Sequence, residues 1–313
     1  MKNRYPIDQS PLFRLKTRVK LAALLGLTAD ELQRFCAEQE AQYDRFKKDI
    51  IKNGKTKTRY IERPKPPLRR IQKRISELLN RITPPPYLHS GVSGRSYISN
   101  ASQHDTGTMT PCAKIDIRDF FRSAYAGYIF RSFVDVFECS DDVSACLMRL
   151  TSTEHHIPTG GNSSTIISFY AFKPMFDEIY DLASTRGLMM TCCVDDMSFT
   201  GTAATSGFLN EVRLIVEKYR LKTHKRRCFK AGQPRIVTGV ALASNGMRIP
   251  NLRRRKLHEV AAKFAAAKDP EQKFKFGQEL LGRVTEAAQI EDRFAPLVER
   301  AAEDLSTAKR ALQ

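Results

Sequence analysis

Two short apolar runs, residues 188–194 and 197–200, flank the pair Asp195-Asp196. Runs of this length, rich in Met, Val, Thr and Phe and interrupted by two polar residues, are typical of strands joined by a tight turn. The pattern therefore predicts a hairpin with two carboxylates at its tip. Adjacent like charges beside apolar strands cost free energy unless a cation neutralises them. Taken alone, however, Asp-Asp is also an ordinary signal for a solvated turn.

A third carboxylate, Asp116, lies near the end of the strand-like run 113–117, which leads into a helical turn. If this strand neighbours the predicted hairpin in one sheet, three carboxylates converge on one place. Such a cluster suits Mg²⁺, which takes oxygen ligands and keeps open positions for substrate phosphates. Two Mg²⁺ ions bound by Asp116, Asp195 and Asp196 would activate a 3′-hydroxyl and stabilise a leaving pyrophosphate.

The chain is strongly basic, because its 52 Lys and Arg outnumber its 34 Asp and Glu among 313 residues, a formal charge of +18. This excess favours a polyanionic partner, with nucleic acid first, although charge alone would also fit solubility or an anionic membrane. No run approaches the ~20 apolar residues of a membrane span, and the first thirty residues lack a signal-peptide pattern, so we expect no membrane partner.

The seven cysteines contain no C-x-x-C pair. They indicate buried thiols in a reducing cytoplasm rather than a zinc site or a disulfide framework.

Local patterns predict mostly helices around this sheet. Thr28 and Glu31 are placed as a capping box for an N-terminal helix, and apolar residues at helical spacing predict a helix over 68–82. Residues 141–150 and 163–186 are two further predicted helices.

Three other segments are set apart by composition. Residues 52–63 are basic and predict a hairpin around Gly54. Residues 87–111 are rich in Gly, Ser, Asn and Thr and predict a long loop. Beyond Gly246 the chain is predicted to be almost wholly helical and basic.

Residues 114–121, Lys-Ile-Asp-Ile-Arg-Asp-Phe-Phe, resemble the first palm motif of reverse transcriptases. The resemblance implies that Asp116 binds metal and that Phe121 faces the incoming sugar, where its ring selects deoxynucleotides. A plain core aromatic is the alternative for Phe121. Residues 193–196 resemble the family's Tyr-Ala-Asp-Asp or Tyr-Met-Asp-Asp box, but Cys193 replaces the tyrosine, which leaves the rate and fidelity of synthesis open.

Other positions resemble the parts of such a polymerase that bind the nucleotide. Thr159 and Gly160 lie in a segment similar to the family's Leu-Pro-x-Gly-x-x-x-Ser, which lies against the template and the nascent base pair. Lys57 and Arg59 resemble finger residues that contact the triphosphate, with a solvated charged hairpin as the alternative. Lys225 stands where such enzymes carry a lysine that protonates the leaving pyrophosphate, although the adjacent arginines leave its register open.

Two further motifs identify the chain as a member of the retron branch. Asn100-Ala101-Ser102-Gln103-His104 matches an Asn-Ala-x-x-His signature before the first palm motif, and Val237-Thr238-Gly239 matches a Val-Thr-Gly signature after the Asp-Asp hairpin. The resemblance implies a cognate structured noncoding RNA, priming from a guanosine 2′-hydroxyl, and a branched RNA–DNA product, multicopy single-stranded DNA. It further implies dNTP substrates, a role in antiphage defence and an accessory effector protein.

The expected fold is α+β: a right-hand polymerase with fingers, a palm built on a small antiparallel sheet, and an α-helical thumb. The expected divisions are 1–48, an N-terminal helical extension; 49–112, fingers; 113–243, palm with intervening finger helices; and 244–313, helical thumb. The predicted RNA-binding residues are Asn100, His104, Val237, Thr238, Gly239, Arg253, Arg254, Arg255 and Lys256. The alternatives are a group II intron-like or diversity-generating reverse transcriptase, and a catalytically idle RNA-binding scaffold of a toxin-antitoxin complex.

Overall fold

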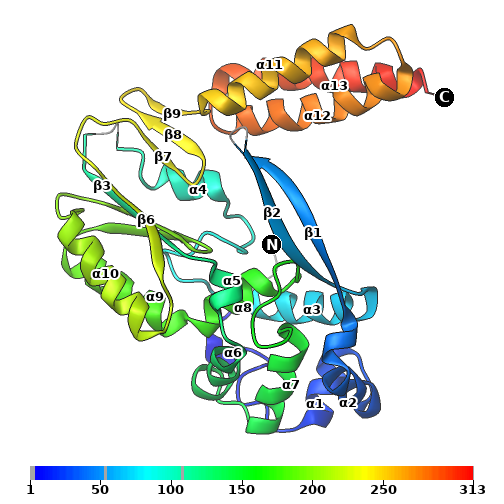
Figure 1. Ribbon diagram of the computed structural model, residues 1–313, viewed down its shortest axis with the longest axis vertical. Coiled ribbons are helices and arrows are strands. Elements are labelled where there is room, and N and C mark those ends of the chain that lie inside the picture. Colours follow the sequence, from blue (N-terminus) through cyan, green and yellow to red (C-terminus); the bar gives the residue numbers. More distant parts are fainter. Residues whose placement is uncertain (1–3, 53–54, 107–108, 313) are drawn as a thin grey trace.

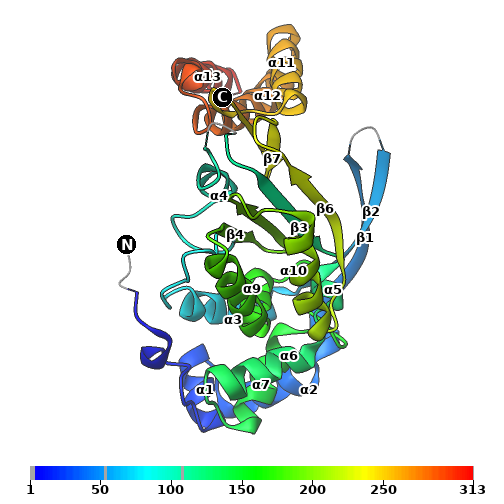
Figure 2. The same cartoon turned by 90° about the vertical axis from the view of Figure 1, so that its left-hand side faces the viewer.

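A four-stranded antiparallel sheet with strand order β4-β5-β3-β6 is the centre of the computed structural model, which describes residues 4–52, 55–106 and 109–312. Its strands are β3 (Cys112–Ile117), β4 (Met189–Cys193), β5 (Asp196–Thr200) and β6 (Thr223–Phe229). Figures 1 and 2 show α9 (Lys173–Thr185) and α10 (Ser206–Lys218) side by side against this sheet. The rings of Phe199 and Phe208 meet edge to face at 4.9 Å between strand and helix. The hairpin predicted over residues 188–200 is confirmed.

A long hairpin of β1 (Tyr43–Lys52) and β2 (Lys55–Pro64) extends beside the sheet, as Figure 1 shows in blue. The predicted basic hairpin is confirmed, and it is longer than expected because β1 begins at Tyr43. Gly54, the expected turn residue, lies outside the described residues.

The base of β2 is bonded to the turn that precedes α8. Thr159 donates from Oγ1 to the Tyr60 carbonyl at 2.8 Å, and Gly160 N donates to the Glu62 carbonyl at 3.1 Å. His156 Nε2 lies 2.9 Å from Glu62 Oε1, and both side chains are buried. These contacts join the hairpin to the central unit.

The helices around the sheet follow the apolar spacing of the sequence. The capping box of Thr28 and Glu31 is present at α2. The helix predicted over 68–82 is α3, which buries the predicted apolar face but ends at Leu79, so that Ile82 lies beyond it in a bridge with Tyr5. The helices in this part of the chain are α1 (Arg18–Leu25), α2 (Ala29–Ala37), α3 (Pro66–Leu79), α4 (Tyr97–Ser102), α5 (Phe120–Ser123), α6 (Ala126–Arg131), α7 (Asp141–Thr151) and α8 (Ser164–Ala171).

Three local expectations are wrong. The predicted loop 87–111 contains α4, because Ser96 accepts hydrogen bonds from the backbone of its first turn and supplies a capping box. The predicted helix 163–186 is two helices that break at Phe172, since Pro174 has no N–H to continue the hydrogen-bond ladder. Cys228 is exposed rather than buried, because β6 is an edge strand of the sheet.

The C-terminal part is helical, as predicted, and has a hydrophobic core of its own. A three-stranded sheet of β7 (Arg235–Val237), β8 (Val240–Ala243) and β9 (Gly246–Arg248) leads into α11 (Asn251–Ala266), α12 (Pro270–Ala288) and α13 (Ala295–Arg310). Its core includes Val237, Val240, Leu257 and Val284 and also takes in residues of α4. The mixture of helices and small antiparallel sheets agrees with the α+β class. Within the described ranges, no helix has the length and apolar character needed to cross a membrane.

Gly160 offers a test of how the hairpin docks. A Cβ at this position would lie 2.8 Å from the Glu62 carbonyl oxygen, so Gly160→Ala is expected to cost about 1–3 kcal/mol of unfolding free energy. The matched control is Gly282→Ala, which has no atom within 4 Å of the new Cβ and lies in α12. It should instead stabilise by about 0.5–1 kcal/mol. Urea unfolding of both variants measures the two effects, and equal stabilities would contradict the close approach.

Candidate active site

Two carboxylates face each other across neighbouring strands. Asp116 of β3 stands in register with Asp196, the first residue of β5, and Asp195 occupies the turn immediately before it. Ile117 N donates to the Asp195 carbonyl at 2.9 Å, so the pairing extends to the turn itself. The sheet neighbours predicted from the sequence are therefore confirmed, and all three aspartates lie at one end of the β3–β5 ladder.

The turn is held in an unusual conformation. Val194 has φ 63°, a left-handed value that is rare for a β-branched residue, and its N–H donates to Ser90 Oγ at 2.9 Å. Ser90 belongs to the segment 87–95, which also bonds to both backbone groups of Cys192 on β4. The surrounding structure thus fixes the backbone that presents Asp195.

Burial and mutual repulsion make these carboxylates costly to ionise. Burial and then the neighbouring charge of Asp116 raise the pKa of Asp195 to about 6. Burial also raises the pKa of Asp196, although Lys114 opposes the shift from 3.2 Å. Lys114 lies two residues before Asp116, so the two side chains share a face of β3. Its role was therefore readable from strand periodicity but was not predicted.

A β-bulge turns Lys225 toward Asp116. The β3–β6 register shifts between Lys114 and Asp116, and Lys225 takes φ 51° at this irregularity. Its Nζ lies 3.0 Å from Asp116 Oδ2, and its side chain is 64% exposed and so free to leave. His224 Nδ1 lies 3.2 Å from Asp116 Oδ1, yet among the described residues neither atom has a hydrogen-bond partner of good geometry.

The part of the chain that the structure describes contains no group of three or more His, Cys, Asp or Glu side chains arranged to hold a metal ion. Lys114 and Lys225 instead balance the carboxylate charge. The donor chemistry nevertheless fits a hard divalent cation, because the three side chains offer carboxylate oxygens and the buried Asp116 Oδ1 has no hydrogen-bond partner among the described residues.

The aromatic residue and the turn predicted to contact the nucleotide lie on connected segments. Phe121 is half-buried and stacks on Phe120 at 6.1 Å, and its carbonyl accepts from Ile157 N at 3.2 Å. Ile157 leads into the turn of Thr159 and Gly160. These two residues contact the backbone of β2, so their observed role is to dock the hairpin.

The two basic residues predicted to contact the triphosphate lie on β2. Arg59 stands opposite Lys48 of β1 and is exposed. Lys57 pairs with Ile50, and its side chain lies outside the described residues. The hairpin also contacts α5 directly, because the Arg122 guanidinium lies 5.5 Å from the centre of the Tyr60 ring.

The two short motifs expected to bind RNA are joined to each other and largely buried. Asn100, His104 and Val237 are 0% exposed. Asn100 Nδ2 donates to Thr238 Oγ1 at 3.4 Å, and Thr238 Oγ1 donates to the Tyr97 carbonyl at 2.7 Å. These buried side chains do not reach solvent in this structure, so a part for them in RNA recognition has to be indirect.

The predicted thumb cations divide into two kinds. Arg253 pairs with Glu286 at 2.7 Å and lies over the Tyr97 ring at 5.0 Å, and its guanidinium fills the space beside Gly239. Arg254 lies 3.9 Å from buried Glu291. Arg255 and Lys256 are exposed, and Arg255 bonds to Glu259 on its own helix. Tyr97 and Glu286 were not predicted, since no local pattern links two residues so far apart in sequence.

Comparison with known proteins gives consistent relatives. The chain is 30% identical over 213 residues to the retron Se72 reverse transcriptase of Salmonella heidelberg (strain 579083-10), an alignment that covers 66% of this chain and 55% of that protein. It is 24% identical over 281 residues to the retron Mx162 reverse transcriptase of Myxococcus xanthus, covering 77% and 56%, and 22% identical over 266 residues to the retron Ec48 reverse transcriptase of Escherichia coli, covering 79% and 63%. The chain is a relative of the retron reverse transcriptases. It spans between 55% and 63% of the length of these three proteins, and no protein-family profile matches it.

His104, in the first of the two short motifs, should affect how the unfolding free energy depends on pH. His104 is clamped between Thr200 Oγ1 at 2.8 Å and Thr191 Oγ1 at 2.7 Å, and burial, reinforced by the charge of Arg235, lowers its pKa from 6.5 to about 3. The unfolded chain therefore binds an extra proton between these two pH values. The stability contributed by neutral His104 is complete above pH 6.5 and is lost as the pH falls toward 3.

We expect His104→Gln to reduce the slope of unfolding free energy against pH by up to about 1.4 kcal/mol per unit below pH 6.5. Denaturant unfolding at several pH values measures this slope. Exposed His258→Gln is the control and should keep the slope of the parent. A residual slope is expected in both, because burial also lowers the pKa of His89 to about 4. An unchanged slope in His104→Gln would contradict the buried neutral imidazole.

Proposed function

We propose that the chain is an RNA-directed DNA polymerase that performs two-metal nucleotidyl transfer at Asp116, Asp195 and Asp196. The observation that carries this proposal is the pairing of Asp116 with Asp196 in one ladder, with Asp195 in the adjoining turn. Such a concentration of buried negative charge is unfavourable without cations. Similarity to three retron reverse transcriptases supports the same activity.

The three aspartates are proposed to hold two Mg²⁺ ions, which when bound lower the pKa of a 3′-hydroxyl and neutralise charge on phosphate oxygens. Lys225, whose side chain is mostly exposed, would leave Asp116 to such ions. Its ammonium would stay beside the same site, where it could donate a proton to the leaving pyrophosphate. Lys114 stays paired with Asp196 and limits repulsion within the cluster.

The incoming dNTP is proposed to lie between the sheet and the β1–β2 hairpin. Lys57 and Arg59 of β2 bind its triphosphate, and the ring of Phe121 lies under the sugar, where a 2′-hydroxyl would collide with it. Thr159 and Gly160 hold the base of the hairpin at the correct distance. In this layout residues 49–112 are fingers, 113–243 palm and 244–313 thumb, behind an N-terminal extension of 1–48.

The proposed substrate is a cognate structured noncoding RNA. Priming occurs from a guanosine 2′-hydroxyl of that RNA, the product is branched multicopy single-stranded DNA, and the cytoplasmic role is antiphage defence with an accessory effector. Exposed Arg255 and Lys256 are the direct RNA contacts of the thumb. Asn100, His104, Val237, Thr238, Gly239, Arg253 and Arg254 act indirectly by positioning that thumb on the palm.

A second candidate is an RNA-binding scaffold without catalysis. The observation that favours a scaffold is Cys193, which stands where the reverse-transcriptase motif has a tyrosine. Incorporation assays separate the two functions, because the scaffold binds RNA but adds no nucleotide.

The metal site is tested by Asp195→Asn combined with Asp196→Asn. Loss of the ligand charge should reduce dNTP incorporation on a primed RNA by at least about 100-fold, since several kcal/mol of transition-state stabilisation disappears. RNA affinity should stay nearly unchanged. Asp8→Asn with Asp304→Asn removes the same charge elsewhere and should retain incorporation. Normal synthesis by the Asp195/Asp196 variant would refute the mechanism.

Sugar selection is tested at Phe121. Removing the ring in Phe121→Ala should lower the preference for dNTP over rNTP by at least about 10-fold, equivalent to ~1.4 kcal/mol of discrimination. Phe121→Tyr keeps a ring of the same outline and should keep the preference. Single-nucleotide incorporation with each substrate measures the ratio. If Phe121→Ala discriminates as well as the parent, Phe121 is a core aromatic only.

A further inference from the structure

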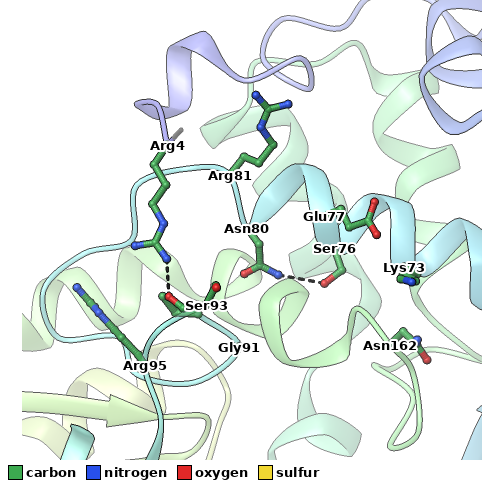
Figure 3. Close-up of a pocket in the computed structure, with 11 residues that line it drawn as sticks. Arg4, Lys73, Ser76, Glu77, Asn80, Arg81, Gly91, Ser93, Arg95 and Asn162 are labelled. Carbon is green, nitrogen blue, oxygen red and sulfur yellow. Dashed lines mark hydrogen bonds between the residues drawn. The ribbon is translucent and has the colours of Figure 1, made fainter. Parts of the chain in front are cut away.

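A cavity of about 850 Å³ lies between the N-terminal segment, α3 and the segment 87–95, outside the carboxylate site. Its walls carry four cationic side chains, Arg4, Lys73, Arg81 and Arg95, and one carboxylate, Glu77. Figure 3 shows these side chains around the opening. The eleven lining residues thus have a net charge of +3, against +18 for all 313 residues, so the positive charge is concentrated here well beyond the average of the chain.

Two cations of this cavity, Arg4 and Arg95, are bonded to neutral backbone groups. Arg4 donates to the Ser93 carbonyl at 2.7 Å, and Arg95 donates to the carbonyls of Pro85 and Leu88. Burial, and then the nearby charge of Arg4, lower the pKa of Arg95. The one lining carboxylate, Glu77, lies 3.9 Å from Arg74, which is outside the cavity.

The position of Arg4 and Arg81 is set by the backbone. Tyr5 pairs with Ile82 in a short bridge, with Tyr5 N donating to the Arg81 carbonyl at 3.1 Å. The Arg81 guanidinium lies 5.1 Å from the centre of the Tyr5 ring. Arg4 and Arg81 are therefore held in position without a ligand, which lowers the entropic cost of binding an anion.

The lining identifies the kind of anion. Among the described residues, the cavity lining contains no aromatic side chain on which a base could stack, but it offers amides and hydroxyls such as Asn80, Ser76 and Asn162 next to the cations. Phosphate oxygens match this set of cations and hydrogen-bond donors. The cavity begins directly after Ser90, whose hydroxyl holds Val194 beside Asp195.

We propose that this cavity, outside the carboxylate site, binds the phosphodiester backbone of an RNA strand through Arg4, Lys73, Arg81 and Arg95. The choice of RNA rests on the proposed function. Each neutralised phosphate of a single strand releases about 0.7 counterion, so the cavity should contribute measurably to the salt dependence of RNA binding.

The experiment uses the full chain and a fluorescein-labelled oligouridylate as probe. The variant Arg4→Gln/Lys73→Gln/Arg81→Gln should raise its Kd at least about 10-fold, and the slope of log K against log salt should become shallower by about 2, three times 0.7. The control Lys20→Gln/Arg34→Gln/Arg70→Gln removes three exposed cations outside the lining and should change Kd less than about threefold. A pocket variant that loses no more affinity than this control overturns the proposal.

Two further measurements separate loss of the cavity's charge from misfolding and from binding of a different ligand. Lys73→Gln alone removes an exposed side chain with little risk to folding and should still reduce the slope by about 0.7. Inorganic tripolyphosphate tests the alternative of a small polyphosphate ligand. The RNA assignment is overturned if tripolyphosphate raises the Tm of the parent but not that of the triple variant, while the triple variant binds oligouridylate as tightly as the parent does. Binding needs no synthesis, so absence of dNTP incorporation by the parent chain refutes the proposed function and leaves this inference to be decided by Kd alone.

Discussion

Electrostatic repulsion between Asp116 and Asp196, which stand opposite each other on neighbouring strands, is the constraint around which the central sheet is arranged. Like charges directly across a ladder are destabilising, and burial increases the cost. Two lysines offset this repulsion. Lys114 lies on the same face of β3 and pairs with Asp196, and Lys225, which a bulge in the β3–β6 pairing turns toward Asp116, pairs with Asp116. Lys114 is largely buried and stays in place, whereas Lys225 is mostly exposed and replaceable. The two lysines therefore offset carboxylate charge, one from a largely buried position and one from an exposed side chain.

A second set of contacts connects the C-terminal helices to the sheet. Thr238 is bonded to both Asn100 and the Tyr97 carbonyl, and Tyr97 in turn contacts Arg253 and Glu286. Two motifs that are well separated in sequence therefore form one joint between α4, the β7–β9 sheet and α11. Any displacement of that joint would move the exposed cations of α11, Arg255 and Lys256, relative to the carboxylates.

Sequence patterns with short periods predicted the elements well. The hairpin around Asp195, the strand carrying Asp116 and the helix α3 follow from alternation and helical spacing, and the neighbourhood of β3 and β5 followed from the need to gather carboxylates. Long-range side-chain pairs were not predictable in the same way. The burial of Asn100 and the pairing of Arg253 with Glu286 depend on packing between parts that no local pattern relates. The composition of residues 87–111 led to the wrong prediction of a loop, because the capping box at Ser96 stabilises α4 within this Ser- and Gly-rich segment.

Cys193, the departure from the resembling motif, fits the same electrostatic constraint. It pairs with Asp196 in the β4–β5 register, and burial together with the charges of Asp196 and Asp195 raises the pKa of its thiol to about 11. The side chain is therefore neutral at physiological pH and adds no fourth negative charge to the cluster. A thiol is also smaller than a phenol, so it leaves more room beside the turn while Ser90 and the left-handed Val194 hold the backbone of Asp195 in place. The substitution thus changes the space next to the carboxylates without changing their charge.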